Sequence, residues 1–179
     1  STANSHKRIM VIEVMGHNAG WLAPYSGIAG GGDVILIPEI PYEEQIVTDY
    51  LVRRASNEKP YSIVVVAEGI RHKKGKPAAQ YIGDMITTET GLETRETILG
   101  YIQRGGSPTP ADRLLATRYG TSAVEMISRG EFGVMVSLHG NKIVGVPLSE
   151  VEGKQRTVEP DHPFIHNSRK IDICFGDRK

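Results

Sequence analysis

Short runs of consecutive apolar residues alternate along the chain with longer segments in which apolar residues recur every three or four positions. Residues 9–14, 34–37 and 63–67 are rich in valine and isoleucine. Successive side chains on a strand point to opposite faces of the sheet, so an unbroken apolar run is typical of a strand covered on both faces, as in a parallel sheet. The pattern therefore predicts strands over these segments.

Helical spacing separates these runs. Residues 41–55 carry an apolar stripe with a polar back, formed by Ile46, Val47, Tyr50, Leu51 and the stem of Arg54. Residues 21–29 also have a helical pattern, in which Pro24 delays the start or bends the helix. These helices are placed to connect neighbouring strands of a parallel sheet.

The clearest predicted helix covers residues 110–129. Thr109 is suited to cap it, Pro110 to its first turn, and Asp112 follows three residues after the cap. Gly130 ends it, where a left-handed residue is favoured. The expected buried stripe comprises Leu115, Tyr119, Ala123, Met126 and Ile127.

A strand pair follows over residues 134–138 and 142–146, joined by a hairpin turn at Gly140 and Asn141. Beyond Pro147 the pattern weakens, and no role is assigned to this tail. Strands that alternate with helices indicate an α/β fold with a mostly parallel sheet covered by helices. The length of 179 residues suits a single domain over 1–179.

Composition removes several classes of protein. Lys plus Arg and Asp plus Glu both number 21, whereas nucleic-acid binders usually carry a basic excess. The longest apolar run, residues 63–67, is too short to cross a bilayer. No secretory signal opens the chain, and the single cysteine, Cys174, has no partner for an internal disulfide. We therefore expect no nucleic-acid or membrane partner and a cytoplasmic location.

Candidate chemistry follows the predicted strands, because ligands of open α/β sheets bind beyond the carboxyl ends of the strands. Residues 15–20 form a glycine-bracketed turn, Glu68 and Gly69 follow the third run, and residues 101–106 follow a further run around 97–99. Arginine matches phosphate in two-point contacts, glycines let N–H groups approach an anion, and a carboxylate accepts bonds from sugar hydroxyls. The set favours a phosphorylated polyol over a peptide or a metal, and the six histidines lack zinc-ligand spacing.

Each of these residues also has a purely structural interpretation. Glycines after strands commonly make turns, and Glu68 could cap a helix or pair with Arg71. Tyr101 could belong to the core, and Arg104 could be a solvated surface residue. On the residues alone these alternatives stay open.

Longer motifs are more specific. Residues 11–21, VIEVMGHNAGW, resemble the strand and turn VxEVMGRxAG of the 6-phosphofructokinase family. Residues 29–39 resemble the family's next helix end and strand, and residues 90–108, with GYIQRGGSP at their end, match its second hallmark. Residues 1–8 resemble the segment that joins the family's two halves. The resemblance runs in order and spacing from residue 1 to about 140 and implies the C-terminal, sugar-phosphate-binding half.

The family phosphorylates fructose 6-phosphate at its 1-hydroxyl in glycolysis, with Mg²⁺ and either ATP or pyrophosphate as donor. By resemblance, the backbone of Met15 and Gly16 and the side chain of Glu68 hold the sugar, and Arg104 with Tyr101 binds the 6-phosphate. The resemblance also implies that Arg8 and Arg95 bind the 6-phosphate held by a neighbouring subunit, so that the protein is a homo-oligomer. The donor loop and the catalytic base belong to an N-terminal half that precedes this segment. We therefore expect the chain alone to be inactive.

Two positions depart from the family's pattern. His17 stands where many members have an arginine that stabilises the phosphoryl group in transit, and a histidine is fully charged only when protonated. Tyr101 stands where many ATP-dependent bacterial members have a histidine. These departures keep a non-catalytic sugar-phosphate sensor or inactive subunit as an alternative. A kinase of related architecture that acts on NAD or a lipid is a third hypothesis, which the motif around Gln103 disfavours.

Overall fold

The computed structural model describes residues 8–57, 59, 61–72 and 75–178. By its contacts the chain divides into two compact units, Ser1–Gln103 with Arg156–Lys179, and Arg104–Gln155. Residues 1–7, most of the segment compared above with the family's connecting segment, lie outside the described residues. That residues 1–179 form one domain stays a prediction, and each unit is described by itself below.

The first unit is built on a four-stranded parallel sheet. Its strands are β1 (Ile9–Val14), β2 (Val34–Leu36), β3 (Ser62–Ala67) and β4 (Thr94–Ile98), in the order β2-β3-β1-β4. The three strands predicted from apolar runs are confirmed to within one residue. The α/β fold with a mostly parallel sheet is confirmed as well.

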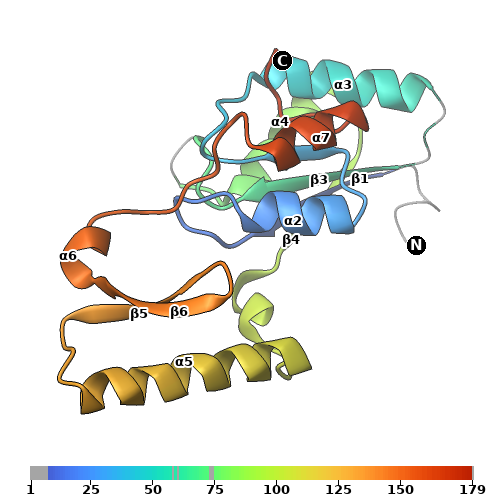
Figure 1. Ribbon diagram of the computed structural model, residues 1–179. Helices are drawn as coiled ribbons and strands as arrows, with labels where there is room; N and C mark the ends of the chain where they lie inside the picture. Colours follow the sequence, from blue (N-terminus) through green and yellow to red (C-terminus); the bar gives the residue numbers. More distant parts are fainter. Residues whose placement is uncertain (1–7, 58, 60, 73–74, 179) are drawn as a thin grey trace. The chain divides into compact units, whose positions relative to one another are not determined.

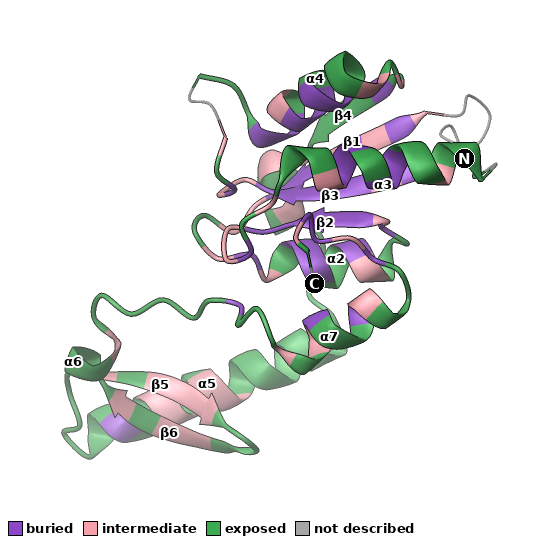
Figure 2. Cartoon of the chain, turned by 90° about the horizontal axis from the view of Figure 1, so that it is seen from above, coloured by how far each residue is buried: buried purple, intermediate pink, exposed green. Residues whose placement is uncertain are grey.

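Helices cover both faces of this sheet. α3 (Glu44–Ser56) and α4 (Ala78–Thr90) contact each other on one face, and α2 (Leu22–Ala29) packs against β2 and β3 on the other (Figure 1). The predicted helices at 21–29 and 41–55 are confirmed, and Val47, Tyr50 and Leu51 of the expected stripe are buried. The core is the layer of aliphatic side chains on β1, β2 and β3, whose residues are mostly buried (Figure 2).

The tail, for which no role was predicted, returns to this first unit. It forms α7 (Pro163–Lys170) and then runs parallel to the edge strand β2, where Ile35 donates its N–H to the Cys174 carbonyl and Cys174 donates to Asp33, both at 2.9 Å. Four of its apolar side chains are buried: Val158, Ile165, Ile173 and Phe175. The tail thus covers the β2 edge of the sheet, which is one way in which proteins protect exposed sheet edges.

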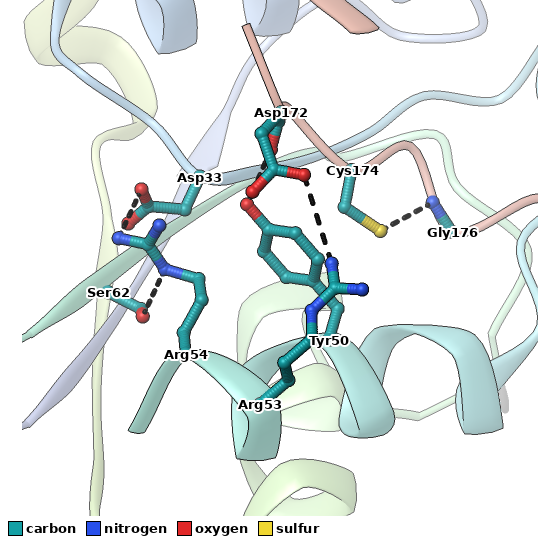
Figure 3. Close-up of polar contacts among 8 residues, drawn as sticks. All are labelled: Asp33, Tyr50, Arg53, Arg54, Ser62, Asp172, Cys174 and Gly176. Atoms are coloured by element: carbon teal, nitrogen blue, oxygen red, sulfur yellow. Dashed lines mark hydrogen bonds and ion pairs between the residues drawn. The ribbon is translucent and has the colours of Figure 1, made fainter. Parts of the chain in front are cut away.

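Polar side chains form hydrogen bonds and ion pairs around the β2 edge and the tail (Figure 3). Tyr50 of α3 donates its hydroxyl hydrogen to the Asp172 carbonyl. Beside it, Arg54 pairs with Asp33 at 2.6 Å and donates to the Ser62 hydroxyl at 3.2 Å. Burial raises the pKa of the Asp33 carboxyl above its usual value, even though the Ile63 N–H and the Arg54 guanidinium act in the opposite direction. The β2 edge is therefore held by both apolar and polar contacts.

The second unit consists of α5 (Pro110–Ser128), the antiparallel strands β5 (Val134–His139) and β6 (Lys142–Pro147), and the single turn α6 (Leu148–Val151). The predicted capping box is confirmed, since Asp112 donates its N–H to the Thr109 hydroxyl and Thr109 donates its own N–H to the Asp112 carboxylate. The predicted hairpin is confirmed by the antiparallel pairing of β5 and β6. In the described part of the chain no helix, α5 included, is long and apolar enough to cross a membrane.

The buried stripe predicted for α5 is wrong for most of its members. Met126 is buried, but Leu115 is 36% exposed and Ile127 is 58% exposed. The hairpin contacts α5, and Tyr119 and Ala123 are only half-buried. A two-stranded hairpin covers only a narrow strip of a helix, and most of the α5 surface is exposed or half-buried (Figure 2).

The capping box makes the start of α5 sensitive to acid. Hydrogen bonds from the Thr109 hydroxyl and N–H hold the pKa of the Asp112 carboxyl below its ordinary 3.8. A carboxyl with a lowered pKa stabilises the fold above its ordinary pKa and loses this effect as the pH falls through the lowered value. We expect the NMR shifts of residues 110–113 to lose their helical character in that acid range. Asp112→Asn, which accepts without titrating, should remove this pH dependence, and an unchanged dependence would contradict the assignment.

Candidate functional site

The turn that leaves the central strand β1 has a backbone that few sequences allow. Gly16 has φ +145°, and a Cβ atom there would lie 2.4 Å from the Ala19 carbonyl oxygen, so this position requires glycine. His17 follows with φ +52°, which is uncommon for a residue other than glycine. Ala19 closes the turn by donating its N–H to the Gly16 carbonyl at 2.9 Å. Such strain persists only where the surroundings hold it in place.

Two side chains from the neighbouring strands hold this turn. Oε1 of Glu68, which follows β3, accepts from the N–H groups of Gly16 at 3.0 Å and His17 at 2.7 Å. Oε1 of Gln103, which lies beyond β4, accepts from the N–H of Met15 at 3.3 Å. Because β1 lies between β3 and β4, the side chains approach its turn from both sides. The structure therefore brings Met15, Gly16, His17 and Glu68 together, as the sequence predicts.

The loop after β3 packs directly against the turn. A Cβ atom on Gly69 would lie 1.9 Å from the His17 carbonyl oxygen and 3.2 Å from the Pro38 ring. Only glycine allows the two loops to approach this closely. Gly69, which the sequence placed beside Glu68 without a role, therefore sets the spacing between the carboxylate and the turn.

A cavity of about 370 Å³ opens beside this turn. It is lined by Glu13, His17, Asn18, Glu68, Gly69, His72, Lys76, Pro77 and Ala78. It therefore lies at the carboxyl ends of β1 and β3 and at the start of α4, where an open α/β sheet binds its ligands. Its walls carry carboxylates, imidazoles and an ammonium group, which suit a polar ligand with hydroxyl groups.

Sequence reasoning missed Glu13 at this cavity. Glu13 is only 9% exposed, and its Oε2 accepts from the N–H of Ala79 in the first turn of α4 at 2.8 Å. A carboxylate at a helix N-terminus satisfies a free N–H group and interacts favourably with the helix dipole. The sequence feature that could have identified it is a single charged residue, Glu13, inside the otherwise apolar strand β1. Glu13 thus fixes the start of α4 against the central strand.

Tyr101 and Arg104, the residues proposed for the phosphate, belong to the short 3₁₀ helix η1 (Gly100–Arg104). Both side chains are exposed, and Tyr101 is exposed to 78%. Tyr101 belongs to the first unit and Arg104 begins the second. Their roles in binding a phosphate stay predictions.

Arg8 and Arg95 come together, but at the other end of the sheet. Arg8 pairs with Glu93 at 3.1 Å, and Arg95 pairs with the other oxygen of the same carboxylate at 2.8 Å. Both arginines lie where β1 and β4 begin, whereas Glu68 lies where β3 ends. Since these strands are parallel, the arginines of one chain do not reach the same ligand as its own Glu68. Their role toward a neighbouring copy stays a prediction.

Among the described residues, no group of three or more His, Cys, Asp or Glu side chains is placed to hold a metal ion. Where the Mg²⁺ implied by the family resemblance binds stays a prediction. The carboxylates of Glu68 and Glu13 each accept a hydrogen bond from a backbone N–H group.

Comparison with known proteins agrees with the motifs that form this turn. The model of the family described as Phosphofructokinase matches residues 1–127, which is more than half of the chain. The chain belongs to the phosphofructokinase family. The match includes the β1 turn, Glu68 and all of η1.

Several curated phosphofructokinases are similar over nearly the whole chain. "ATP-dependent 6-phosphofructokinase 3" of Bacteroides thetaiotaomicron is 59% identical over 98% of this chain and 52% of its own length. "ATP-dependent 6-phosphofructokinase" of Spirochaeta thermophila is 52% identical over 99% of this chain and 53% of its own length. The chain therefore spans about half the length of these curated relatives.

Solved phosphofructokinase structures share the fold. The Saccharomyces cerevisiae enzyme superposes with a TM-score of 0.72 at 39% identity, over 83% of this chain and 21% of the yeast chain. A pyrophosphate-dependent phosphofructokinase from Marinobacter aquaeolei gives a TM-score of 0.78 over 97% of this chain and 50% of its own. Its identity is 24%, so that likeness concerns the fold alone.

Proposed function

We propose that this chain supplies the fructose 6-phosphate site of a 6-phosphofructokinase, which transfers a phosphoryl group to the 1-hydroxyl of the sugar in glycolysis. The observation that carries the proposal is the turn of β1, whose successive N–H groups are fixed by Glu68 and Gln103 beside a polar cavity. The match of the family model over this turn supports it.

Each site residue has a role in the proposal. Oε1 of Glu68 holds the turn, and its other oxygen accepts a hydrogen bond from a sugar hydroxyl. The backbone of Met15 and Gly16 lines the sugar. Arg104 binds the 6-phosphate through charge-assisted, two-point contacts, and Tyr101 donates a further hydrogen bond. Holding the phosphate in this way fixes the 1-hydroxyl at the opposite end of the sugar for in-line attack.

The phosphoryl donor and its Mg²⁺ are proposed to bind to a part of the enzyme outside this chain. This is supported by the length of the chain, which spans about half of its curated relatives. Relatives at 59% and 52% identity carry ATP-dependent names, which favours ATP over pyrophosphate as the donor.

His17 is proposed to contact the phosphoryl group in transit and carries a full positive charge only when protonated. The chain alone is proposed to be inactive.

The working site also includes a neighbouring copy of the chain. Arg8 and Arg95 both pair with Glu93 at the amino ends of their strands. A second copy would bring its own 6-phosphate site to this pair. A homo-oligomer is therefore part of the proposal.

The proposal is tested at Arg104. Arg104→Ala is expected to lower the affinity for fructose 6-phosphate by at least about tenfold, because a hydrogen bond to a charged group contributes about 1.5–3 kcal/mol. Isothermal calorimetry measures the affinity. Arg129→Ala is the control, since Arg129 is an exposed arginine of the same unit that pairs with Glu131. Equal affinities of both variants would contradict the phosphate role. Binding without turnover by the full-length enzyme would favour the non-catalytic alternative.

A further inference from the structure

We propose that Gln103 is a positioning residue of the sugar site, acting through the turn at Met15. The proposal rests on the proposed function and adds to it a residue for which no role was predicted. Gln103 lies in the hallmark motif between Tyr101 and Arg104, and its side chain is half-buried. Its amide connects η1 with the end of the central strand.

The orientation of the Gln103 amide is fixed by its two partners. Nε2 donates to the Gly100 carbonyl at 3.1 Å, and Oε1 accepts from the Met15 N–H at 3.3 Å. A carbonyl only accepts and an N–H only donates, so the reversed amide would lose both bonds. Gln103 is therefore held in one rotamer with its oxygen directed at the turn.

Gln103 and Glu68 hold the turn from opposite sides. Glu68 accepts from the N–H groups of Gly16 and His17, and Gln103 accepts from the N–H of Met15, the residue just before them. With Gln103 removed, the turn is held only from the β3 side. The positive φ angles at Gly16 and His17 then lose part of the support that keeps them in a sparsely populated conformation.

The same amide also determines the position of η1 relative to the turn. Gly100 has φ +51°, and its carbonyl is held by Gln103 within the short helix that carries Tyr101. Gln103 therefore sets the distance between the backbone proposed for the sugar and the residue proposed beside its phosphate. Small misplacements of binding groups have large effects on productive ligand geometry.

The test compares Gln103→Leu with Gln103→Glu in this chain. The Leu variant loses both bonds, and the Glu variant keeps an acceptor for Met15 but has no donor for Gly100 when ionised. We expect the Leu variant to bind fructose 6-phosphate about three- to tenfold more weakly, the range that corresponds to one hydrogen bond. The Glu variant should recover part of the affinity. Gln80→Leu, at an exposed position of α4, is the control.

A second readout does not depend on the ligand. The ¹H–¹⁵N NMR signal of the Met15 amide should shift upfield in the Leu variant and return toward the parent position in the Glu variant. Unchanged affinity and an unchanged Met15 signal in the Leu variant would overturn the proposal. So would a loss of affinity that follows a lowered melting temperature in both variants. If the parent chain forms a dimer or tetramer and does not bind fructose 6-phosphate, the proposed function fails, and the Met15 signal still tests the contact of Gln103.

Discussion

Replacement of Phe175 by alanine is expected to lower the free energy of unfolding of the chain by about 3–5 kcal/mol, the usual cost of removing a buried aromatic ring. Phe175 is 1% exposed and lies in the tail segment that runs along β2. Its loss leaves a cavity in the core and weakens the closure of the β2 edge. Chemical denaturation, followed by circular dichroism, measures the change.

The matched control for Phe175→Ala is Phe132→Ala. Phe132 is 73% exposed and lies in the second unit, so its truncation removes little buried surface. We expect a change below about 1 kcal/mol. If both variants unfolded at the same denaturant concentration, the tail would not be part of the core as the structure shows it.

Replacement of Gly69 by alanine is expected to be nearly as damaging and to act on the site as well. The new methyl group would lie 1.9 Å from the His17 carbonyl oxygen, which belongs to the backbone and is unable to rotate away. The loop after β3 or the β1 turn must then move, at a cost of about 1–3 kcal/mol in stability. Glu68 moves with its loop, so the affinity for fructose 6-phosphate is expected to fall by at least about tenfold. Denaturation and calorimetry measure the two effects.

Gly120→Ala is the control for Gly69→Ala. Gly120 lies inside α5, and a Cβ atom there meets nothing within 4 Å. Alanine is the better helix former by about 0.8–1 kcal/mol, so this variant should be stabilised and should bind as the parent does. A Gly69→Ala chain that matched the parent in both stability and affinity would show that the close approach of the two loops is unimportant.

The parts of the fold that sequence predicted well are those with a strong local signal. The apolar runs of β1, β2 and β3 and the capping box at Thr109 each depend on neighbouring residues only. β4 has the sequence TRETI and is exposed after its first residue, so it lacks an apolar run. α4 was missed although Ile82, Met85 and Ile86 have helical spacing, because small residues interrupt the stripe.

The features that could not be predicted depend on contacts between distant segments. The tail is polar and contains prolines, and only its contact with β2 shows why Phe175 and Ile165 are buried. The stripe of α5 was overestimated, because the width of the surface that covers a helix is not encoded in the helix itself. Ile127 is the clearest case, at 58% exposed.

At the site, strand order decided which predictions could be made. Residues that end parallel strands meet at one edge, so Gly16 and Glu68 could be grouped from the sequence. The position of β1 between β3 and β4 was not known, and Gln103 was therefore not recognised as a second support of the turn. Glu13 lies within an apolar strand, and its hydrogen bond to the first turn of α4 depends on a contact between distant segments.

The central claim, that this chain contains a sugar-phosphate site, is tested most directly by calorimetric titration of the unmodified chain with fructose 6-phosphate. Fructose is titrated as the control that lacks the phosphate, and light scattering records the oligomeric state in the same buffer. The account predicts saturable binding of fructose 6-phosphate and none of fructose. A chain that forms a dimer or tetramer and binds neither sugar would contradict it.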